Sequence, residues 1–433
     1  MCNIYFGKFI KPKLIPKLDF ENGVPEECST FVVIPTILKS KEKVKELMEK
    51  LEVYYLANKS ENIYFALLGD CSSGKNKEEK FDKEVEEEGI KQVKILNEKY
   101  NVQGNFPKFS FIYRKRFWNG KEECYLGWER KRGLLTQFNE YILGNEENVF
   151  KINTLEEWKK ENIYLKQTEN KFPKIKYIIT LDSDTELTLN SAFKLIGAMA
   201  HILNKPILNK NKDKVIAGHA LIQPRVGISL PSARKNLFTK IYAGSGGVDP
   251  YVNAISDIYQ DTFDEGIFTG KGIYDLQTFS TVLKNEIPEN TVLSHDLLEG
   301  SYLRAGLATD ICLMDGYPEN YNSYKSREHR WIRGDFQIIR WLGKYIIDKK
   351  ENKKINPLNK LSKYKIFDNL IRALFPILAI FSLIYLCLLE KIFKINLSPF
   401  IIAILISVCA PTIIDIINKI IYKRERKEDS KEL

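Results

Sequence analysis

The chain has 433 residues, of which 44% are hydrophobic and 28% charged, as in ordinary globular proteins. Its net charge of +10 does not predict a nucleic-acid partner. The basic residues gather beside an apolar C-terminal region, and no aromatic–basic motif of an RNA- or DNA-binding module is present. The seven cysteines are scattered without a CxxC pair, which argues against a disulfide framework or a zinc site and is typical of a reducing cytoplasm.

Up to about residue 200, short apolar runs alternate with amphipathic stretches. Four runs predict buried strands, the first of them closed by Pro35: residues 30–36, 63–70, 109–113 and 177–181. Apolar residues at helical spacing predict helices around residues 44–51, 78–100, 134–142 and 192–199. Strands that alternate with helices usually form a mostly parallel sheet with its site at the carboxyl ends of the strands, so we expect an α/β fold.

The region from residue 225 to residue 341 is rich in glycine, aspartate and aromatic residues and shows weak periodicity. Long irregular stretches within a domain are usually functional loops. We therefore expect this region to supply loops to the site.

Two apolar segments follow, at residues 373–389 and 397–417. Each is near the ~20 residues that span a bilayer, and prolines such as Pro376 and Pro411 are tolerated in membrane helices. Only a short charged stretch around Glu390-Lys391-Ile-Phe-Lys394 separates them, so the pattern predicts a transmembrane helical hairpin. Lysines and arginines crowd both flanks, and the positive-inside rule places both flanks in the cytoplasm. A buried helical pair in a soluble protein is the alternative.

The segment Tyr177-Ile-Ile-Thr-Leu-Asp-Ser-Asp-Thr185 ends an apolar strand in two aspartates. Side chains at i and i+2 of an extended segment share a face, so Asp182 and Asp184 can reach one ion. Such carboxylates hold Mg²⁺ or Mn²⁺, which share their ligand shell with a diphosphate. At a strand end, this arrangement suggests a nucleotide-sugar transferase. A strand followed by an Asp-rich turn is the alternative.

Four clusters of side chains that could take part in catalysis or substrate binding occur in order along the chain. They are Asp70, Asp182-Ser-Asp184, Ser294-His-Asp-Leu-Leu-Glu-Gly300 and Arg327-Glu-His-Arg-Trp-Ile-Arg-Gly-Asp335. This order resembles the processive inverting glycosyltransferases of the cellulose-synthase type, which have a GT-A fold. Those proteins carry an Asp after the second strand, an Asp-x-Asp, a later Asp that acts as base, and Gln-x-x-Arg-Trp before membrane helices. Arg330 and Trp331 match the last motif, whereas Arg327 stands where it has Gln.

Longer strings resemble the glycosyltransferase domain of cyclic β-1,2-glucan synthases, over residues 31–341. They are Ile222-Gln-Pro-Arg-Val226, Gly247-Val-Asp-Pro-Tyr251, Ser256-Asp-Ile-Tyr-Gln-Asp261, Phe268-Thr-Gly-Lys-Gly-Ile-Tyr-Asp275, Pro288-Glu-Asn-Thr-Val-Leu-Ser-His-Asp296 and His329-Arg-Trp-Ile-Arg-Gly-Asp335. Those synthases are very long chains with further membrane helices and a phosphorylase-like domain. The resemblance therefore implies a fragment, a split component with further domains as partners, or a relative that does not cyclise its product.

The resemblance implies roles for the residues of the later clusters. Asp296 would be the general base that takes the acceptor hydroxyl proton as its oxygen attacks the anomeric carbon. Arg330 would neutralise the departing pyrophosphate, and Trp331 would offer an apolar face to an acceptor sugar. His295 would be a further metal ligand beside Asp182 and Asp184 or would tune Asp296. A structural histidine bonded to backbone is equally open, and a core tryptophan is the alternative for Trp331.

The remaining expected site residues bind substrate. Asp70 would accept from the uracil or ribose of the donor, and Lys131 and Arg132 would lie near the diphosphate. Lys271 lies on the glycine-rich loop 268–272, which would approach the acceptor closely. The rest of the expected binding set is Asp182, Arg327, Arg333 and Asp335. A strand-end turn for Asp70 and a solvated basic face for Lys131 remain open.

We expect five parts: an N-terminal extension or fragment boundary (1–28), a GT-A glycosyltransferase domain (29–345), a basic juxtamembrane segment (346–370), two transmembrane helices (371–418) and a charged cytoplasmic tail (419–433). The resemblance implies transfer of glucose from UDP-glucose to a growing β-1,2-glucan, by a multi-pass protein of the inner membrane whose domain faces the cytoplasm. Two alternatives stay open: a non-catalytic membrane module that binds glycan or a synthase, and a transferase for another nucleotide-sugar. A phosphoryl transferase is disfavoured because no P-loop is present.

Overall fold

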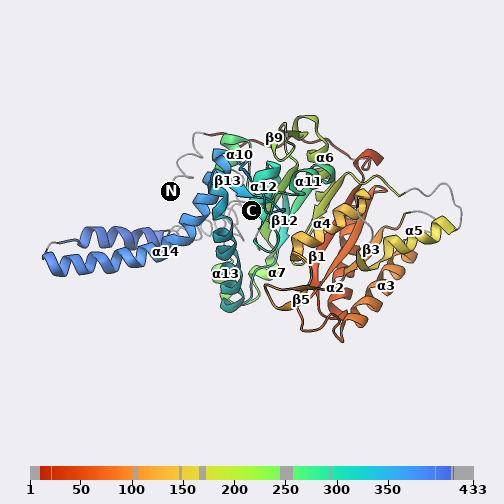
Figure 1. Ribbon diagram of the computed structural model, residues 1–433, viewed down its shortest axis with the longest axis horizontal. Coiled ribbons are helices and arrows are strands. Elements are labelled where there is room, and N and C mark those ends of the chain that lie inside the picture. The colour runs from red at the N-terminus through yellow and green to blue at the C-terminus, as the bar shows by residue number, and fades with distance from the viewer. Residues whose placement is uncertain are drawn as a thin grey trace, which may run out of the picture.

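A computed structural model of the protein describes residues 10–20, 22–100, 106–145, 149–164, 172–243, 257–292, 295–394, 396–410 and 413. Within these residues the centre is an eight-stranded sheet with the order β12-β10-β11-β7-β1-β2-β3-β6 (Figure 1). Its strands are β1 (Thr30–Leu38), β2 (Ile63–Cys71), β3 (Phe109–Arg114), β6 (Phe150–Asn153), β7 (Tyr177–Thr180), β10 (Leu221–Ile228), β11 (Gly272–Asp275) and β12 (Gly306–Asp315). Antiparallel pairing is confined to β11 and β6, so the predicted mostly parallel α/β fold is confirmed.

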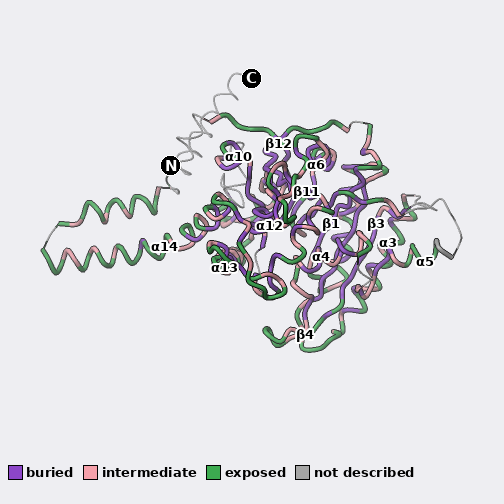
Figure 2. Tube along the Cα trace, turned by 45° about the horizontal axis from the view of Figure 1, so that its top comes forward, coloured by how far each residue is buried: buried purple, intermediate pink, exposed green. Residues whose placement is uncertain are grey.

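Helices cover both faces of this sheet. One layer contains α2 (Lys41–Ala57), α3 (Asp82–Lys99) and α6 (Ser191–Ala200), and the other contains α4 (Arg130–Leu143), α11 (Leu276–Leu283) and α12 (Asp296–Leu303). Along β1, Phe31 and Val33 pack on the second layer, whereas Val32 and Ile34 pack on the first. A strand buried on both faces reads as a continuous apolar run, and Figure 2 shows these strands as the buried centre of the molecule.

The smaller elements lie around this centre. They are η1 (Glu26–Cys28), β4 (Phe117–Asn119), β5 (Cys124–Leu126), α5 (Thr154–Tyr164), η2 (Ile202–Asn204), β8 (Ile207–Leu208), β9 (Val215–Ala217), α7 (Leu230–Ala233), α8 (Leu237–Tyr242), α10 (Ile258–Phe263), η3 (Ile339–Leu342), β13 (Tyr345–Ile347) and β14 (Lys353–Ile355). The strings at residues 247–251 and Ser256, and the expected tail at 419–433, lie outside the described residues.

Pro35 does not close the first strand, because β1 continues through it to Leu38. β7 pairs with β1 only as far as Val33, whose carbonyl oxygen accepts a hydrogen bond from the Leu181 N–H at 3.0 Å. Alternate residues of a parallel strand face the same neighbouring strand, so the Pro35 nitrogen faces a side on which no described strand pairs at that level. The missing N–H therefore removes no ladder hydrogen bond.

The region predicted as long loops is more regular than expected. It contains the sheet strands β10, β11 and β12 and the 17-residue helix α13 (Tyr321–Gln337). Gly334 is the buried residue of α13. A helix with so little buried surface has no apolar stripe, and hydrophobic periodicity was the signal that the prediction relied on.

The C-terminal helix α14 (Lys360–Phe393) leaves the body of the molecule as an apolar arm (Figure 1). Its first turns are docked through buried residues such as Ile366 and Leu370, but only 6% of its most apolar 18-residue stretch is buried. Within the described chain it is the one helix long and apolar enough to cross a membrane. A shorter apolar helix, Ser398–Ala410, runs beside it. The exposed arm does not fit the alternative of a helical pair buried within the domain.

Candidate active site

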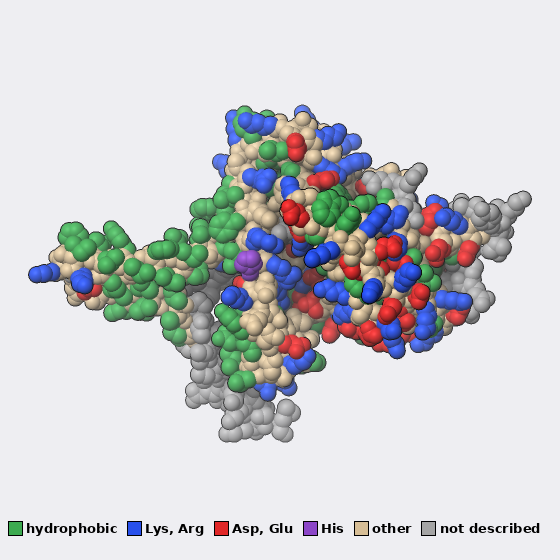
Figure 3. Space-filling view, turned by 60° about the horizontal axis from the view of Figure 1, so that its bottom comes forward, with side chains coloured by type: hydrophobic (Ala, Val, Ile, Leu, Met, Phe, Trp, Pro, Cys, Tyr) green, Lys and Arg blue, Asp and Glu red, His purple; other side chains and the backbone are tan. Residues whose placement is uncertain are grey.

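A cavity of about 780 Å³ opens at the carboxyl ends of β1, β2, β7 and β12. The first turns of α4 and α12, the helix α13 and the docked part of α14 complete its walls. Lys and Arg side chains gather along a hollow near the base of the apolar arm (Figure 3). The site therefore lies where an α/β sheet is expected to bind its ligand.

The Asp182–Asp184 turn is held against the end of β12. Glu186 and Met314 exchange two backbone hydrogen bonds, at 2.6 and 3.2 Å, and the Gly316 N–H donates to the Asp184 carbonyl oxygen at 3.1 Å. These bonds bring the two aspartates beside Asp315, which ends β12. Three carboxylates from two strand ends thus share one wall of the cavity.

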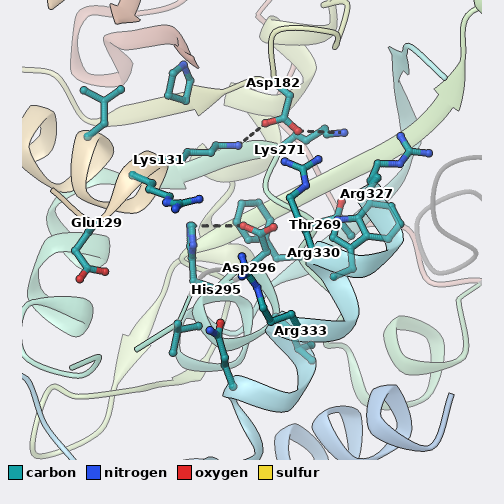
Figure 4. A pocket seen from close by; sticks show the side chains of 18 of the residues that line it. Glu129, Lys131, Asp182, Thr269, Lys271, His295, Asp296, Arg327, Arg330 and Arg333 are labelled. Atoms are coloured by element: carbon teal, nitrogen blue, oxygen red, sulfur yellow. Dashed lines mark hydrogen bonds and ion pairs between the residues drawn. The ribbon is translucent and has the colours of Figure 1, made fainter. Parts of the chain in front are cut away.

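Two lysines cross-link this wall, as Figure 4 shows. The Lys131 ammonium lies 2.5 Å from one carboxylate oxygen of Asp182, and the Lys271 ammonium lies 3.3 Å from the other. Lys271 also pairs with Asp315, and the two side chains are only 7% and 2% exposed. We call these four residues, together with Asp184, the strand-end wall.

The charges of the strand-end wall shift one another's pKa values. Burial works against the Asp182 carboxylate, but Lys131 and Lys271 outweigh it and lower its pKa to about 2. Burial likewise opposes the ammonium of Lys271, yet Asp182 and Asp315 raise its pKa. Asp182 and Lys271 therefore both stay ionised at neutral pH.

Asp184 carries the unbalanced charge of this wall. Loss of hydration within the cavity, and then the neighbouring Asp315, raise the pKa of its carboxyl above the usual value. With Asp182 and Asp315 it makes three carboxylates against the two lysines. Hard oxygen ligands with a surplus of negative charge fit Mg²⁺ or Mn²⁺, with Asp184 exposed toward the cavity.

Asp296 is the first residue of α12 and lines the same cavity. Gly270 packs against its carboxylate: a Cβ there would lie 3.0 Å from Oδ2 of Asp296, and the residue has φ of +90°. Only glycine adopts that backbone and leaves that space without strain. Burial raises the pKa of Asp296 to about 6, Lys131 lowers it and Asp182 raises it again.

His295 groups with Asp296 and Glu299. Its Nε2 lies 3.7 Å from a carboxylate oxygen of each, and the three ligand atoms lie within 4.8 Å of one another. This group does not include Asp182 or Asp184, so the geometry of the described residues gives no support to His295 as a ligand of the same ion. It is placed to act on Asp296, which was the other role expected for it.

The helix α13 forms the opposite wall of the cavity with Arg327, Arg330, Trp331, Arg333 and Asp335. The Arg327 guanidinium stacks over the Trp331 ring at 5.1 Å and over the Tyr317 ring at 5.5 Å. Arg330 and Arg333 are exposed. The arginine that replaces the expected Gln thus braces the tryptophan that follows it.

Asp70 lines the cavity but is engaged by a neighbour. Its two carboxylate oxygens each accept from the Arg114 guanidinium at 2.6 Å, and the residue is 4% exposed. Arg114 also donates to the backbone carbonyls of Trp128 and Arg130, at 2.6 and 2.7 Å. Asp70 is therefore placed to fix the turn that presents Lys131, rather than to meet the donor with a free carboxylate.

Arg132 is not among the residues that line the cavity. Its guanidinium pairs with Glu129 three residues earlier in the chain. On a helix, residues 131 and 132 point about 100° apart, so only Lys131 reaches Asp182. The expected role of Arg132 beside the diphosphate is not supported by its position.

The sequence analysis missed Asp315, and it missed Asn369 and Arg372 of α14, which also line the cavity. Asp315 carried one part of the signal that identified Asp182, because it also ends an apolar run, but no second aspartate follows it. Asn369 donates to Asp335 at 3.2 Å. Neither α14 residue had a signal, since Asn369 lies in the stretch assigned to a juxtamembrane segment and Arg372 at the start of the stretch assigned to transmembrane helices.

The fold and the site have the architecture of the GT-A type, an α/β domain with acidic side chains at the strand ends, here followed by one candidate membrane helix. No family model matches the chain. Over 379 residues, or 87% of this chain, the sequence is 39% identical to the cyclic beta-(1,2)-glucan synthase NdvB of Rhizobium meliloti (strain 1021). The chain belongs to the cyclic β-(1,2)-glucan synthase family. It spans 12% of the length of that relative.

Proposed function

We propose that the protein is a membrane-anchored inverting glycosyltransferase that moves glucose from UDP-glucose to a growing β-1,2-glucan. The observation that carries the proposal is the pairing of two acidic groups across one cavity: Asp182 and Asp184 on the strand-end wall, and Asp296 at the start of α12. One group suits a nucleotide diphosphate, and the other suits an acceptor hydroxyl. The donor and the linkage rest on the family relationship.

The chemical step needs a base on the acceptor side. The acceptor hydroxyl oxygen forms a bond to the anomeric carbon while the bond from that carbon to the UDP oxygen breaks, and the electron pair leaves with UDP. Asp296 takes the hydroxyl proton. A pKa of about 6 leaves this carboxylate mostly ionised at neutral pH while keeping it basic enough to accept a proton.

The leaving diphosphate needs positive charge on the other side. A divalent ion held by Asp182 and Asp184 would stabilise the departing negative charge as a Lewis acid. Lys131 lies on the same wall, and Arg330 and Arg333 face it from α13. Trp331, braced by Arg327, offers an apolar ring to the acceptor sugar.

The apolar arm supports a membrane location. Basic residues flank α14 on the side of the domain, and nucleotide-sugar donors are cytoplasmic. We therefore place the domain on the cytoplasmic face of the inner membrane, with α14 and the apolar segment after it as a two-helix anchor. Because the relative is far longer than this chain, further domains of a larger synthase are the expected protein partners.

The proposal is tested with the purified full chain in lipid nanodiscs, supplied with Mn²⁺, UDP-glucose and a short β-1,2-glucan. We expect UDP release coupled to glucose incorporation in β-1,2 linkage, and arrest by chelator. UDP-galactose and GDP-mannose serve as donor controls. UDP-glucose binding without any UDP release would instead identify a non-catalytic module, and faster turnover with another donor would change the substrate.

A further inference from the structure

The segment from Glu265 to Lys271, which we call the cavity loop, is buried although it has no regular secondary structure. Of its residues only Thr269 is partly exposed. Its last residues build the site, because Gly270 packs on Asp296 and Lys271 of the strand-end wall pairs with Asp182. Buried backbone groups outside helices and sheets need partners of their own, so the partners of this loop decide where it lies.

The middle and end of the cavity loop are held from within the domain. The Thr269 N–H donates to the Gln223 side chain at 3.0 Å, and the Gly270 carbonyl oxygen accepts from Lys131 at 2.9 Å. At its start, the Gly266 N–H donates to the Ala305 carbonyl oxygen at 2.7 Å. The carbonyl oxygens of Glu265 and Gly266 accept from a group that lies a hundred residues away.

That group is the Lys365 ammonium, on the docked part of α14. It lies 3.0 Å from the Glu265 carbonyl oxygen, 2.8 Å from the Gly266 carbonyl oxygen and 3.0 Å from Oε1 of Glu265. An ammonium has three donors, and each has an acceptor here. Lys365 and Glu265 are each 2% exposed, so water does not replace these bonds.

The same helix continues into the apolar arm. Ile366 and Leu370, next to Lys365, are buried in the core that contains Phe268 of the cavity loop. Beyond them most residues of α14 are exposed, although Ala379 is buried. A single helix therefore carries both the candidate membrane segment and the cation that satisfies the start of the cavity loop.

We propose that Lys365 is a positioning residue: it fixes the cavity loop, and through it Lys271 and Gly270, only while α14 is docked on the domain. Its effect on turnover rests on the proposed glycosyltransferase function. Its effect on the loop itself does not. The membrane helix is then part of the active-site framework as well as an anchor.

Lys365→Met is the primary variant, with Lys360→Met as its control, because Lys360 is exposed in the first turn of the same helix. Hydrogen exchange of the peptide covering 265–271 is measured in the full chain, with peptides of β1 and β2 as internal reference. We expect faster exchange in the loop of Lys365→Met alone, and a fall in kcat of about 10- to 100-fold from misplaced catalytic groups. The control should match the wild type in both.

The double variant Lys365→Met, Glu265→Met separates positioning from a merely structural role. It removes both buried charges. If the single variant is unstable only because Glu265 is left buried without a counter-ion, thermal stability should therefore recover in the double variant. The carbonyl oxygens of Glu265 and Gly266 still lack their donor, so loop exchange should stay fast and kcat low. If the single variant does not fold, loop exchange and kcat are measured in the double variant instead.

Unchanged loop exchange in a folded variant, or exchange that rises equally in β1 and β2, would overturn the proposal. So would recovery of kcat in the double variant. If the wild type shows no transferase activity, the proposed function fails, and the exchange data still decide the role of Lys365.

Discussion

The two walls of the cavity are built in opposite ways. The strand-end wall interlocks Lys131, Asp182, Lys271 and Asp315 through ion pairs that are partly or wholly buried. The α13 wall presents Arg330 and Arg333 to solvent, and Gly334 is its buried residue. The first wall has its geometry set by the fold, which on the proposed function suits the fixed placement of a diphosphate. The second has charges and a ring that can adjust to a sugar chain of varying position.

Asp296 lies between the walls, and its replacement should have the largest effect. Asp296→Asn keeps the shape of the side chain but removes the proposed base, so turnover should fall by about 10²- to 10⁴-fold. Donor affinity should persist, because the base acts in the chemical step. UDP release and equilibrium UDP-glucose binding check the two parts. Loss of binding with recovery of turnover at high donor would make Asp296 a donor ligand.

Breaking the strand-end wall should lower both turnover and stability. Asp315→Asn leaves the buried Lys271 ammonium with Asp182 alone, and breaking a buried ion pair costs about 3–5 kcal/mol. We expect turnover to fall by about 10- to 100-fold through the displaced Asp182, with a lower thermal midpoint.

The matched control for that variant is Asp310→Asn, on the same strand. Asp310 pairs with Lys17, and both side chains are about a third exposed, at 30% and 32%. A surface pair of this kind contributes about 0–1 kcal/mol. Equal effects of the two substitutions would show that the wall is not specially fixed.

The pH dependence of turnover should report the Asp296 carboxyl. The proposed base must be deprotonated, and its pKa is raised to about 6, so kcat should rise with pH through 6 and level off above 7. Between pH 5 and pH 7 the change should be about tenfold. The control is a thermal midpoint that stays well above the assay temperature at every pH, because the raised pKa itself lowers stability somewhat as Asp296 loses its proton. A rate that falls as pH rises through 6 would require a protonated group instead.

The α13 wall should give the smallest effect. Trp331→Ala removes a half-buried ring and its stacking with Arg327, but no buried ion pair. The KM for the glucan acceptor should rise several-fold, as expected for a sugar–ring contact, with donor affinity unchanged. Trp118→Ala is the control, because Trp118 is 57% exposed on β4 outside the cavity. A fall in thermal midpoint as large as that of Asp315→Asn would contradict the contrast between the walls.

The two aspartates of the strand-end wall that follow β7 were predictable from the sequence. Most of the ion pairs around the cavity were not. Asp182 and Asp184 follow an apolar run that is buried on both faces of the sheet, a pattern that the sequence displays directly. The pairing of Asp70 with Arg114 joins the ends of two adjacent strands. Nothing in the spacing of these residues distinguishes a bonded carboxylate from a free one.

The α13 wall was predicted by its motif and not by its structure. Its 17 residues carry few buried apolar groups, so hydrophobic periodicity does not reveal the helix.

The role of Lys365 could not be predicted from the sequence either. It belongs to a run of lysines that the sequence analysis assigned to a membrane surface, yet it alone among them is buried to 2%. Local composition does not tell which member of a charged run the tertiary fold encloses.

Calorimetric titration of UDP-glucose into the purified full chain, with Mn²⁺ or with chelator, tests the central claim that the two acidic groups have separate roles. We predict that Asp296→Asn binds the donor within about threefold of the wild type in Mn²⁺, because removal of a base spares ground-state binding. Asp184→Asn should bind no better in Mn²⁺ than in chelator. Metal-dependent binding that survives in Asp184→Asn, or that is lost in Asp296→Asn, would contradict the account.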